Sequence, residues 1–282
     1  MSVLRTGTVR LLDADDAGAV WEVLDRDPVG NVFVASRLRA TGFEHWRLGA
    51  QLWGYVIPEG LESLCFYGAN IIPMCATPAA VGAFAERALR SRRICSSIVG
   101  REESVGPLWQ VLSSEWSPPR DVRTGQPLLV TSAPPAVPAD PGVRRVRLSE
   151  FDTLMPACVA MYTEEVGVSP LGRDNGAGYR ARVSELVAGG HSFARIEGGE
   201  VLFKAEIGAT TGHTCQVQGV WVTPRMRGRG LGSAGTAAVV AEALRSVAPV
   251  VSLYVNSHNT AARRAYERVG FTRAGTNMSV LF

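Results

Sequence analysis

Two kinds of hydrophobic pattern alternate along residues 1–131. Short apolar or alternating runs are typical of strands, and longer runs with apolar residues every three to four positions are typical of helices. The helical pattern after residue 13 carries Ala17, Val20 and Leu24 on one face. Strands are predicted at residues 8–12, 49–57, 61–68, 71–76, 94–99 and around 128, and helices after residues 13 and 28 and at 79–90 and 102–113.

The same order of patterns returns in residues 143–282. A hairpin is predicted around Gly198-Gly199, because two strand-like runs flank this glycine pair. Both halves therefore predict a strand, two helices, three strands, a helix, a strand, a helix and a strand. Strands are predicted at residues 143–146, 192–196, 201–209, 214–222, 250–255 and 278–282, and helices at about 150–161, 178–188, 231–247 and 260–268.

A proline-rich segment separates the two halves. Residues 132–142 contain four prolines among small residues, a composition that favours a semi-extended linker. The predicted organisation is a first domain at 1–131, a linker at 132–142 and a second domain at 143–282. The fold class predicted is α/β with a mixed sheet in each of two tandem domains.

Composition excludes several classes of protein. The chain has 282 residues, 46% of them hydrophobic and 20% charged, with a formal net charge of +3. This charge is too small to indicate nucleic-acid binding, and no apolar run reaches the ~18 residues that a membrane span needs. The five cysteines form no metal-binding spacing and indicate a reducing compartment, so we expect a cytoplasmic protein with no metal and no membrane partner.

The most informative stretch is residues 220–232, Val-Trp-Val-Thr-Pro-Arg-Met-Arg-Gly-Arg-Gly-Leu-Gly. A β-branched run ends before Pro224, and a helix of small residues begins near Leu231. Glycines let backbone N–H groups approach a ligand, and a helix N-terminus adds unsatisfied donors. Arginines add donors that suit phosphate. A glycine-rich turn with solvated arginines is the alternative interpretation.

The spacing is that of neither a P-loop nor a dinucleotide-binding fingerprint. Instead Arg227-Gly228-Arg229-Gly230-Leu231-Gly232 resembles the Gln/Arg-x-x-Gly-x-Gly/Ala signature of the GNAT N-acetyltransferases. The resemblance implies a GNAT fold, with acetyl-CoA as cosubstrate. The residues that it assigns to acetyl-CoA are Val220, Trp221, Val222, Arg227, Gly228, Arg229, Gly230, Leu231, Gly232, Ser233 and Asn259.

The resemblance also implies a β-bulge at Gly219, where a backbone N–H would polarise the acetyl carbonyl. A plain strand with a packing glycine is the alternative. A second signature of the family, asparagine-x-x-alanine-x-x-x-tyrosine, fits Asn259, Ala262 and Tyr266. It implies that Tyr266 protonates the departing thiolate; the alternative is a half-buried packing residue.

The general base is predicted less directly. Many members of the family carry a glutamate early in the motif strand, but this chain has Gln216 and Gln218 there. Glu206 on the preceding strand is the carboxylate candidate. An exposed pair of Glu206 with Lys204, on the same side of the strand, is the alternative. Glu164 and Glu165 are predicted to bind a cationic acceptor.

The predicted function is direct transfer of an acetyl group from acetyl-CoA to a primary amine on a small molecule or peptide. The first half has Met74-Cys75-Ala76-Thr77-Pro78 where the second has its glycines, so we expect a degenerate domain there. This tandem architecture is similar to that of mycothiol synthases. Alternatives are a CoA-sensing protein without turnover and an enzyme that uses another acyl-CoA; the chain is expected to be a monomer or a homodimer.

Overall fold

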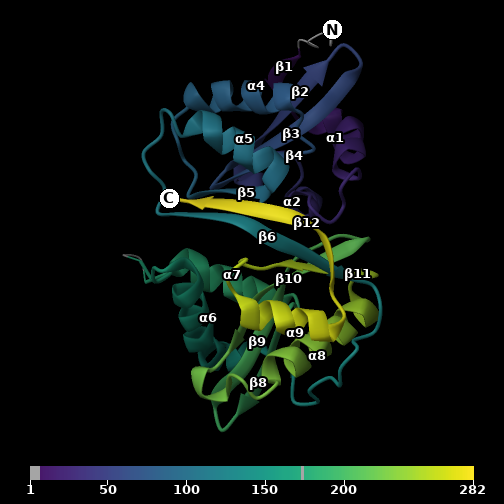
Figure 1. Cartoon of the computed structure of the whole chain (residues 1–282), viewed down its shortest axis with the longest axis vertical. Coiled ribbons are helices and arrows are strands. Elements are labelled where there is room, and N and C mark those ends of the chain that lie inside the picture. The colour runs from purple at the N-terminus through teal and green to yellow at the C-terminus, as the bar shows by residue number, and fades with distance from the viewer. Residues whose placement is uncertain (1–6, 173–174) are drawn as a thin grey trace. The chain divides into compact units, whose positions relative to one another are not determined.

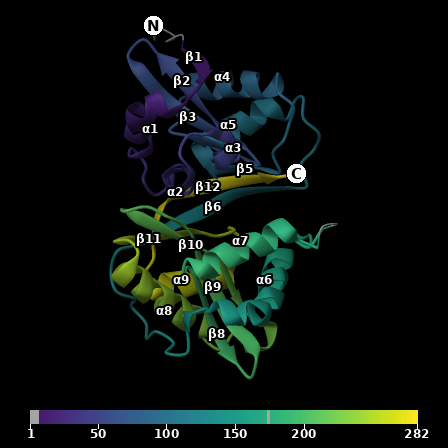
Figure 2. The same cartoon turned by 180° about the vertical axis from the view of Figure 1, so that it is seen from behind.

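A computed structural model describes residues 7–172 and 175–282. The chain forms two compact units (Figures 1 and 2). The first unit comprises the described residues up to Leu128, together with Tyr254–His258 and Ala274–Phe282. The second unit comprises Leu129–Leu253 and Asn259–Arg273.

A mixed sheet forms the centre of the first unit. Its strands run in the order β1-β2-β3-β4-β5-β12-β6, and β4 pairs with β5 in parallel while the other pairings described are antiparallel. The strand bounds are β1 Thr8–Leu11, β2 Ala50–Ile57, β3 Gly60–Gly68, β4 Asn70–Met74, β5 Ser97–Arg101, β6 Asp121–Thr131 and β12 Thr272–Leu281.

Helices cover both faces of this sheet (Figure 1). Apolar residues of α4 and α5 pack with Trp53, Tyr67 and Val280 in one core cluster. Residues of α1 and α2 pack with Leu64 and Phe66 in another. The helix bounds are α1 Ala17–Leu24, α2 Val32–Thr41, α3 His45–Leu48, α4 Pro78–Leu89 and α5 Glu102–Leu112, with a 3₁₀ turn at Ala14–Asp16.

The second unit repeats this layering. Its strands run in the order β11-β10-β9-β8-β7, with β10 and β11 parallel and the others antiparallel. The bounds are β7 Arg144–Arg145, β8 Ser192–Glu197, β9 Glu200–Thr210, β10 Thr214–Val222 and β11 Val250–Tyr254, with helices α6 Phe151–Val166, α7 Ala177–Ala188, α8 Leu231–Ser246 and α9 Thr260–Val269. Two 3₁₀ turns lie at Leu148–Glu150 and Pro224–Met226.

Neighbouring residues of β9 show which helices lie on which face. Phe203 lies directly against Gly235 of α8. Lys204, the next residue, faces Cys158 of α6. Because successive strand residues point to opposite faces, α8 covers one face and α6 the other. The core on the α6 side also includes Val183 and Val187 of α7.

Each helix and strand predicted above is present, with some different bounds. The short helix α3 was not predicted, and β5 begins at Ser97 instead of near residue 94. The last strand begins at Thr272, and its residues from 274 onward lie in the first unit, where β12 pairs with β5. The boundary between the two compact units therefore does not coincide with the linker alone, because the first unit also contains segments near the C-terminus. That residues 1–131 and 143–282 fold as independent domains stays a prediction.

In the part of the chain that the structure describes, no helix is long and apolar enough to cross a membrane.

Candidate functional site

The glycine loop, residues 227–232, connects β10 to α8. Gly228 and Gly230 have φ angles of +74° and +83°, in the left-handed region that favours glycine. Gly230 is the N-cap of α8 and has no side chain that could accept hydrogen bonds from the first turn of the helix. The N–H groups at the start of α8 are therefore available to an anionic ligand.

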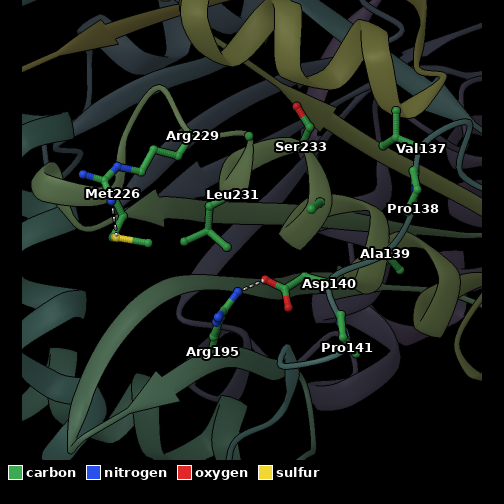
Figure 3. Close-up of a pocket in the computed structure, with 12 residues that line it drawn as sticks. Val137, Pro138, Ala139, Asp140, Pro141, Arg195, Met226, Arg229, Leu231 and Ser233 are labelled. Carbon is green, nitrogen blue, oxygen red and sulfur yellow. Dashed lines mark hydrogen bonds and ion pairs between the residues drawn. The ribbon is translucent and has the colours of Figure 1, made fainter.

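A cavity of about 500 Å³ lies at the start of α8 (Figure 3). Four residues that the sequence assigned to acetyl-CoA line it, namely Arg229, Gly230, Leu231 and Ser233. The other residues assigned to acetyl-CoA do not line this cavity: Val220, Trp221, Val222, Arg227, Gly228, Gly232 and Asn259.

The opposite wall of the cavity is the segment 137–141, which sequence reasoning treated only as a linker (Figure 3). The backbone N–H of Asp140 donates to the Ala234 carbonyl at 3.0 Å. The Asp140 carboxylate accepts from Arg195 at 2.9 Å, and its side chain is only 5% exposed. The backbone hydrogen bond fixes the segment to α8, and the ion pair with Arg195 fixes it to β8. In the sequence, the only sign that this segment makes specific contacts was an aspartate among the prolines.

The β-bulge expected at Gly219 is present. Gln218 pairs with Glu206 and Trp221 pairs with Lys204, so two residues of β10 lie opposite one residue of β9. Gly219 has φ +60°. A Cβ atom there would lie 2.9 Å from the Glu206 carboxyl carbon and 3.0 Å from Lys204 Nζ. The position therefore requires glycine for both its backbone angle and its surroundings.

The alternative interpretation of Lys204 and Glu206 as a solvent-exposed pair is wrong. The two side chains do form an ion pair, with Nζ and Oε2 2.8 Å apart, but Lys204 is 0% exposed and the Glu206 side chain 12%. Helices α6 and α7 cover this face of β9. Burial alone would lower the pKa of Lys204, but the charge of Glu206 and contact with Cys158 outweigh burial and raise it.

Glu164, predicted to bind the acceptor, contacts two residues that were assigned to the cofactor. Its carboxylate accepts from Arg227 at 2.7 Å and from the Trp221 indole at 3.1 Å. Arg227 also donates to the Val222 carbonyl at 3.0 Å. The side chains of Arg227 and Glu164 are each about half exposed. The glycine loop is thus joined to the end of α6.

The second signature lies on α9. Tyr266 is buried, and its ring meets Phe271 edge to face at 6.0 Å between centroids. Burial, and secondarily the charge of Glu165, raise the pKa of Tyr266, so its phenol keeps its proton. Asn259 is the N-cap of α9, because its side-chain oxygen accepts from the Ala262 N–H at 3.1 Å.

The first unit differs at the start of its corresponding helix. Thr77 caps α4 by accepting a hydrogen bond from the Ala80 N–H, and Pro78 at the first turn has no N–H. The first turn of α4 is therefore capped by a side chain, whereas the first turn of α8 is not. Across the described ranges 7–172 and 175–282, no cluster of three or more His, Cys, Asp or Glu side chains is arranged to hold a metal ion.

Several solved structures resemble this chain in fold over nearly its whole length. A Drosophila protein matches with TM-score 0.64 and 13% identity, covering 98% of this chain and 99% of the other. A GNAT-family acetyltransferase of Colwellia psychrerythraea matches with TM-score 0.56 and 11% identity, with coverage of 98% and 99%. A tandem GNAT protein of the clavulanic acid biosynthesis pathway matches with TM-score 0.51 and 13% identity over 98% of each chain.

These likenesses define the mixed α/β fold of the GNAT class and confirm the fold class predicted from the sequence. Residues 152–271 match the family described as Acetyltransferase (GNAT) family. The C-terminal half therefore carries a GNAT acetyltransferase domain, as its motifs predicted. Residues 50–154 match a domain family of unknown function, DUF4081. A comparison with curated proteins gives no match.

Proposed function

We propose that the chain is an N-acetyltransferase that moves an acetyl group from acetyl-CoA directly to a primary amine. The observation that carries this proposal is the start of α8, which has a glycine N-cap, two left-handed glycines and a cavity of about 500 Å³ beside it. These features suit a diphosphate, because N–H donors and the positive end of the helix dipole favour an anion.

The backbone at the Gly219 bulge supplies the next part of the proposal. A bulge leaves its extra residue outside the regular ladder of hydrogen bonds. A free N–H at this point of β10 would donate to the acetyl carbonyl and stabilise the negative charge that develops on its oxygen. The bulge contacts Glu206, so the acetyl carbon and the candidate base would meet at the same place.

Two side chains would move protons. As the amine nitrogen bonds to the acetyl carbon, Glu206 accepts a proton from that nitrogen. As the carbon–sulfur bond breaks, Tyr266 donates its phenolic proton to the sulfur, and the products are an amide and free CoA. The phenol of Tyr266 is protonated at neutral pH, so it has a proton to give to the sulfur.

A thiol-release assay tests this function. The full chain is incubated with acetyl-CoA and a panel of primary amines, including peptides, amino acids, amino sugars and polyamines, and the products are identified by mass spectrometry. We expect amine-dependent release of CoA thiol together with an acetylated amine. Binding of acetyl-CoA with no release for any amine would contradict the enzyme and favour a CoA-sensing protein.

A further inference from the structure

Lys204 is the only lysine in the chain, and it is completely buried in β9. Its ammonium lies 2.8 Å from Glu206 Oε2 and also contacts the thiol of Cys158. Burying an ion pair removes two charges from water, and apolar residues of similar volume are often as stable or more stable. Stability alone therefore does not account for this pair.

The position of the pair indicates a role in the site. A Cβ on Gly219 would lie 2.9 Å from Glu206 Oε1 and 3.0 Å from Lys204 Nζ, so both charged groups border the bulge. Lys204 binds the Oε2 atom of Glu206 and leaves Oε1 against the bulge. Lys204 is closed off from solvent, whereas the Glu206 side chain keeps 12% exposure.

We propose that Lys204 is a positioning residue, which fixes one oxygen of Glu206 and directs the other to the bulge where the acceptor amine would meet the acetyl carbonyl. This inference rests on the proposed function. Lys204 keeps its own protons, while Oε1 of Glu206 takes the proton that leaves the amine nitrogen as the new carbon–nitrogen bond forms.

In the described part of the chain, neutral groups face the Lys204–Glu206 pair from the neighbouring helices and strands. Cys158 of α6 and Tyr179 of α7 face the pair, and Tyr162 packs edge to face on Tyr179. Ser192 of β8 and Gln218 of β10 lie beside Glu206 in the sheet. Burial raises the pKa of the Cys158 thiol and of the Tyr179 phenol, so both stay neutral near pH 7.

A double-mutant cycle tests the role through kinetics. Lys204→Met should lower kcat by about 10- to 100-fold, as misplacement of a reacting group does, with little change in KM for acetyl-CoA. The acidic limb of its pH–rate profile should move to higher pH, because an unpaired buried carboxylate takes up a proton more readily. In a Glu206→Gln background the same substitution should change kcat less than about twofold, since the residue would act only through Glu206.

Equal losses in both backgrounds, or an unmoved pH profile, would overturn the positioning role while leaving the acetyltransferase intact. The double variant Lys204→Met/Glu206→Gln removes both charges and guards against a failure of Lys204→Met to fold. No turnover of the parent chain with any amine would overturn the proposed function and the positioning role together.

A second measurement does not depend on turnover. Labelling with ¹⁵N-lysine gives a single side-chain resonance, because Lys204 is the only lysine. We expect one solvent-protected ammonium signal at pH 7 that moves in Glu206→Gln and when acetyl-CoA is added. Glu185→Gln, which changes an exposed carboxylate of α7, should leave the signal in place. A signal that exchanges freely with water, or that responds to neither change, would overturn the inference.

Discussion

Two features require glycine at position 219. Its backbone angle is left-handed, and a side chain there would overlap the buried Lys204–Glu206 ion pair. Gly198 in the β8–β9 turn shares only the first, because its φ is +56° and an added Cβ would meet nothing within 4 Å. We expect Gly198→Ala to cost about 1–2 kcal/mol of stability through its backbone angle. Gly219→Ala should cost at least about 1 kcal/mol more, because its Cβ also overlaps Glu206 and Lys204.

Urea unfolding of the two variants measures this difference. Equal losses of stability in Gly219→Ala and Gly198→Ala would show that the ion pair does not border the bulge.

Tyr266 allows a separate test of the acid. Tyr266→Phe removes only the hydroxyl and keeps the buried ring against Phe271. We expect kcat to fall by about 100-fold, a typical loss for a general acid, with the acetyl-CoA dissociation constant nearly unchanged. Tyr55→Phe, the same change at a buried tyrosine of the first unit, serves as the control. A Tyr266→Phe enzyme with normal kcat would remove this phenol from the mechanism.

Residue patterns predicted the glycine loop and the shared side of Lys204 and Glu206, and the resemblance to the GNAT family implied the bulge. The period of two in a strand was sufficient to predict that Lys204 and Glu206 share a side. The burial of the pair could not be predicted in the same way, because it depends on which helices cover β9. The second signature identified Asn259 as a contact of acetyl-CoA, whereas in the structure its side chain caps α9, a role that asparagine directly before a helix often has.

At the scale of elements, the end of α6 is joined to the loop before α8 through Glu164 and Arg227. An exposed ion pair of this kind contributes about 0.2–1 kcal/mol. An anionic ligand of the glycine loop would compete with Glu164 for the guanidinium. Glu164→Gln should therefore tighten acetyl-CoA binding by up to about fivefold, with a steeper dependence on salt.

Titration calorimetry at two salt concentrations measures this effect. Glu185→Gln on α7 makes the same change in net charge and should leave the affinity unaltered. Weaker binding in Glu164→Gln would mean that Glu164 orders the loop and does not compete with the ligand.

The contrast between α4 and α8 shows what the sequence predicts well at this scale. The helix predicted at 79–90 is present as α4, and Thr77 is its N-cap. Gly230 at the equivalent point of α8 has no side chain to cap the N–H groups of the first turn. Local chemistry decides such helix ends, so a sequence can predict them. The cavity wall at 137–141 depends on contacts with distant β8 and could not be predicted.

At the scale of the whole molecule, the last strand of the chain belongs to the first unit. Met278 and Val280 of β12 lie in the first unit's core, although residues 259–273 just before them lie in the second unit. Cleavage at an engineered protease site in the exposed segment 132–134 should therefore not release the two halves from each other.

Size-exclusion chromatography of the cleaved protein checks this expectation, with the same sample in urea as the control. Separate elution without urea would show that β12 is not held in the first unit. The order of elements followed from periodicity, but the partner of β12 did not, because periodicity identifies a strand and not the sheet that it joins. A fragment ending near residue 135 would lack this strand and is a poor test of the first half.

The central claim is that the start of α8 binds acetyl-CoA, and a pair of glycines tests it most directly. An alanine at Gly232 would meet only Val222, at 3.7 Å, and one at Gly178 of α7 would meet nothing within 4 Å, so neither substitution should disturb the fold. Each glycine is the second residue of its helix, but only Gly232 lies in the first turn of α8, where the N–H groups would bind the phosphate. Alanine at this position keeps its backbone N–H, but its Cβ would hold a phosphate away from the N–H groups of the first turn. A hydrogen bond to a charged group contributes about 1.5–3 kcal/mol, so the loss of one such bond would weaken binding at least about tenfold.

Titration calorimetry with acetyl-CoA is the measurement. We predict one site per chain with a dissociation constant on the order of micromolar, unchanged in Gly178→Ala and at least about tenfold weaker in Gly232→Ala, with equal thermal stability. No heat at millimolar acetyl-CoA, or equal affinity in the two variants, would contradict the account.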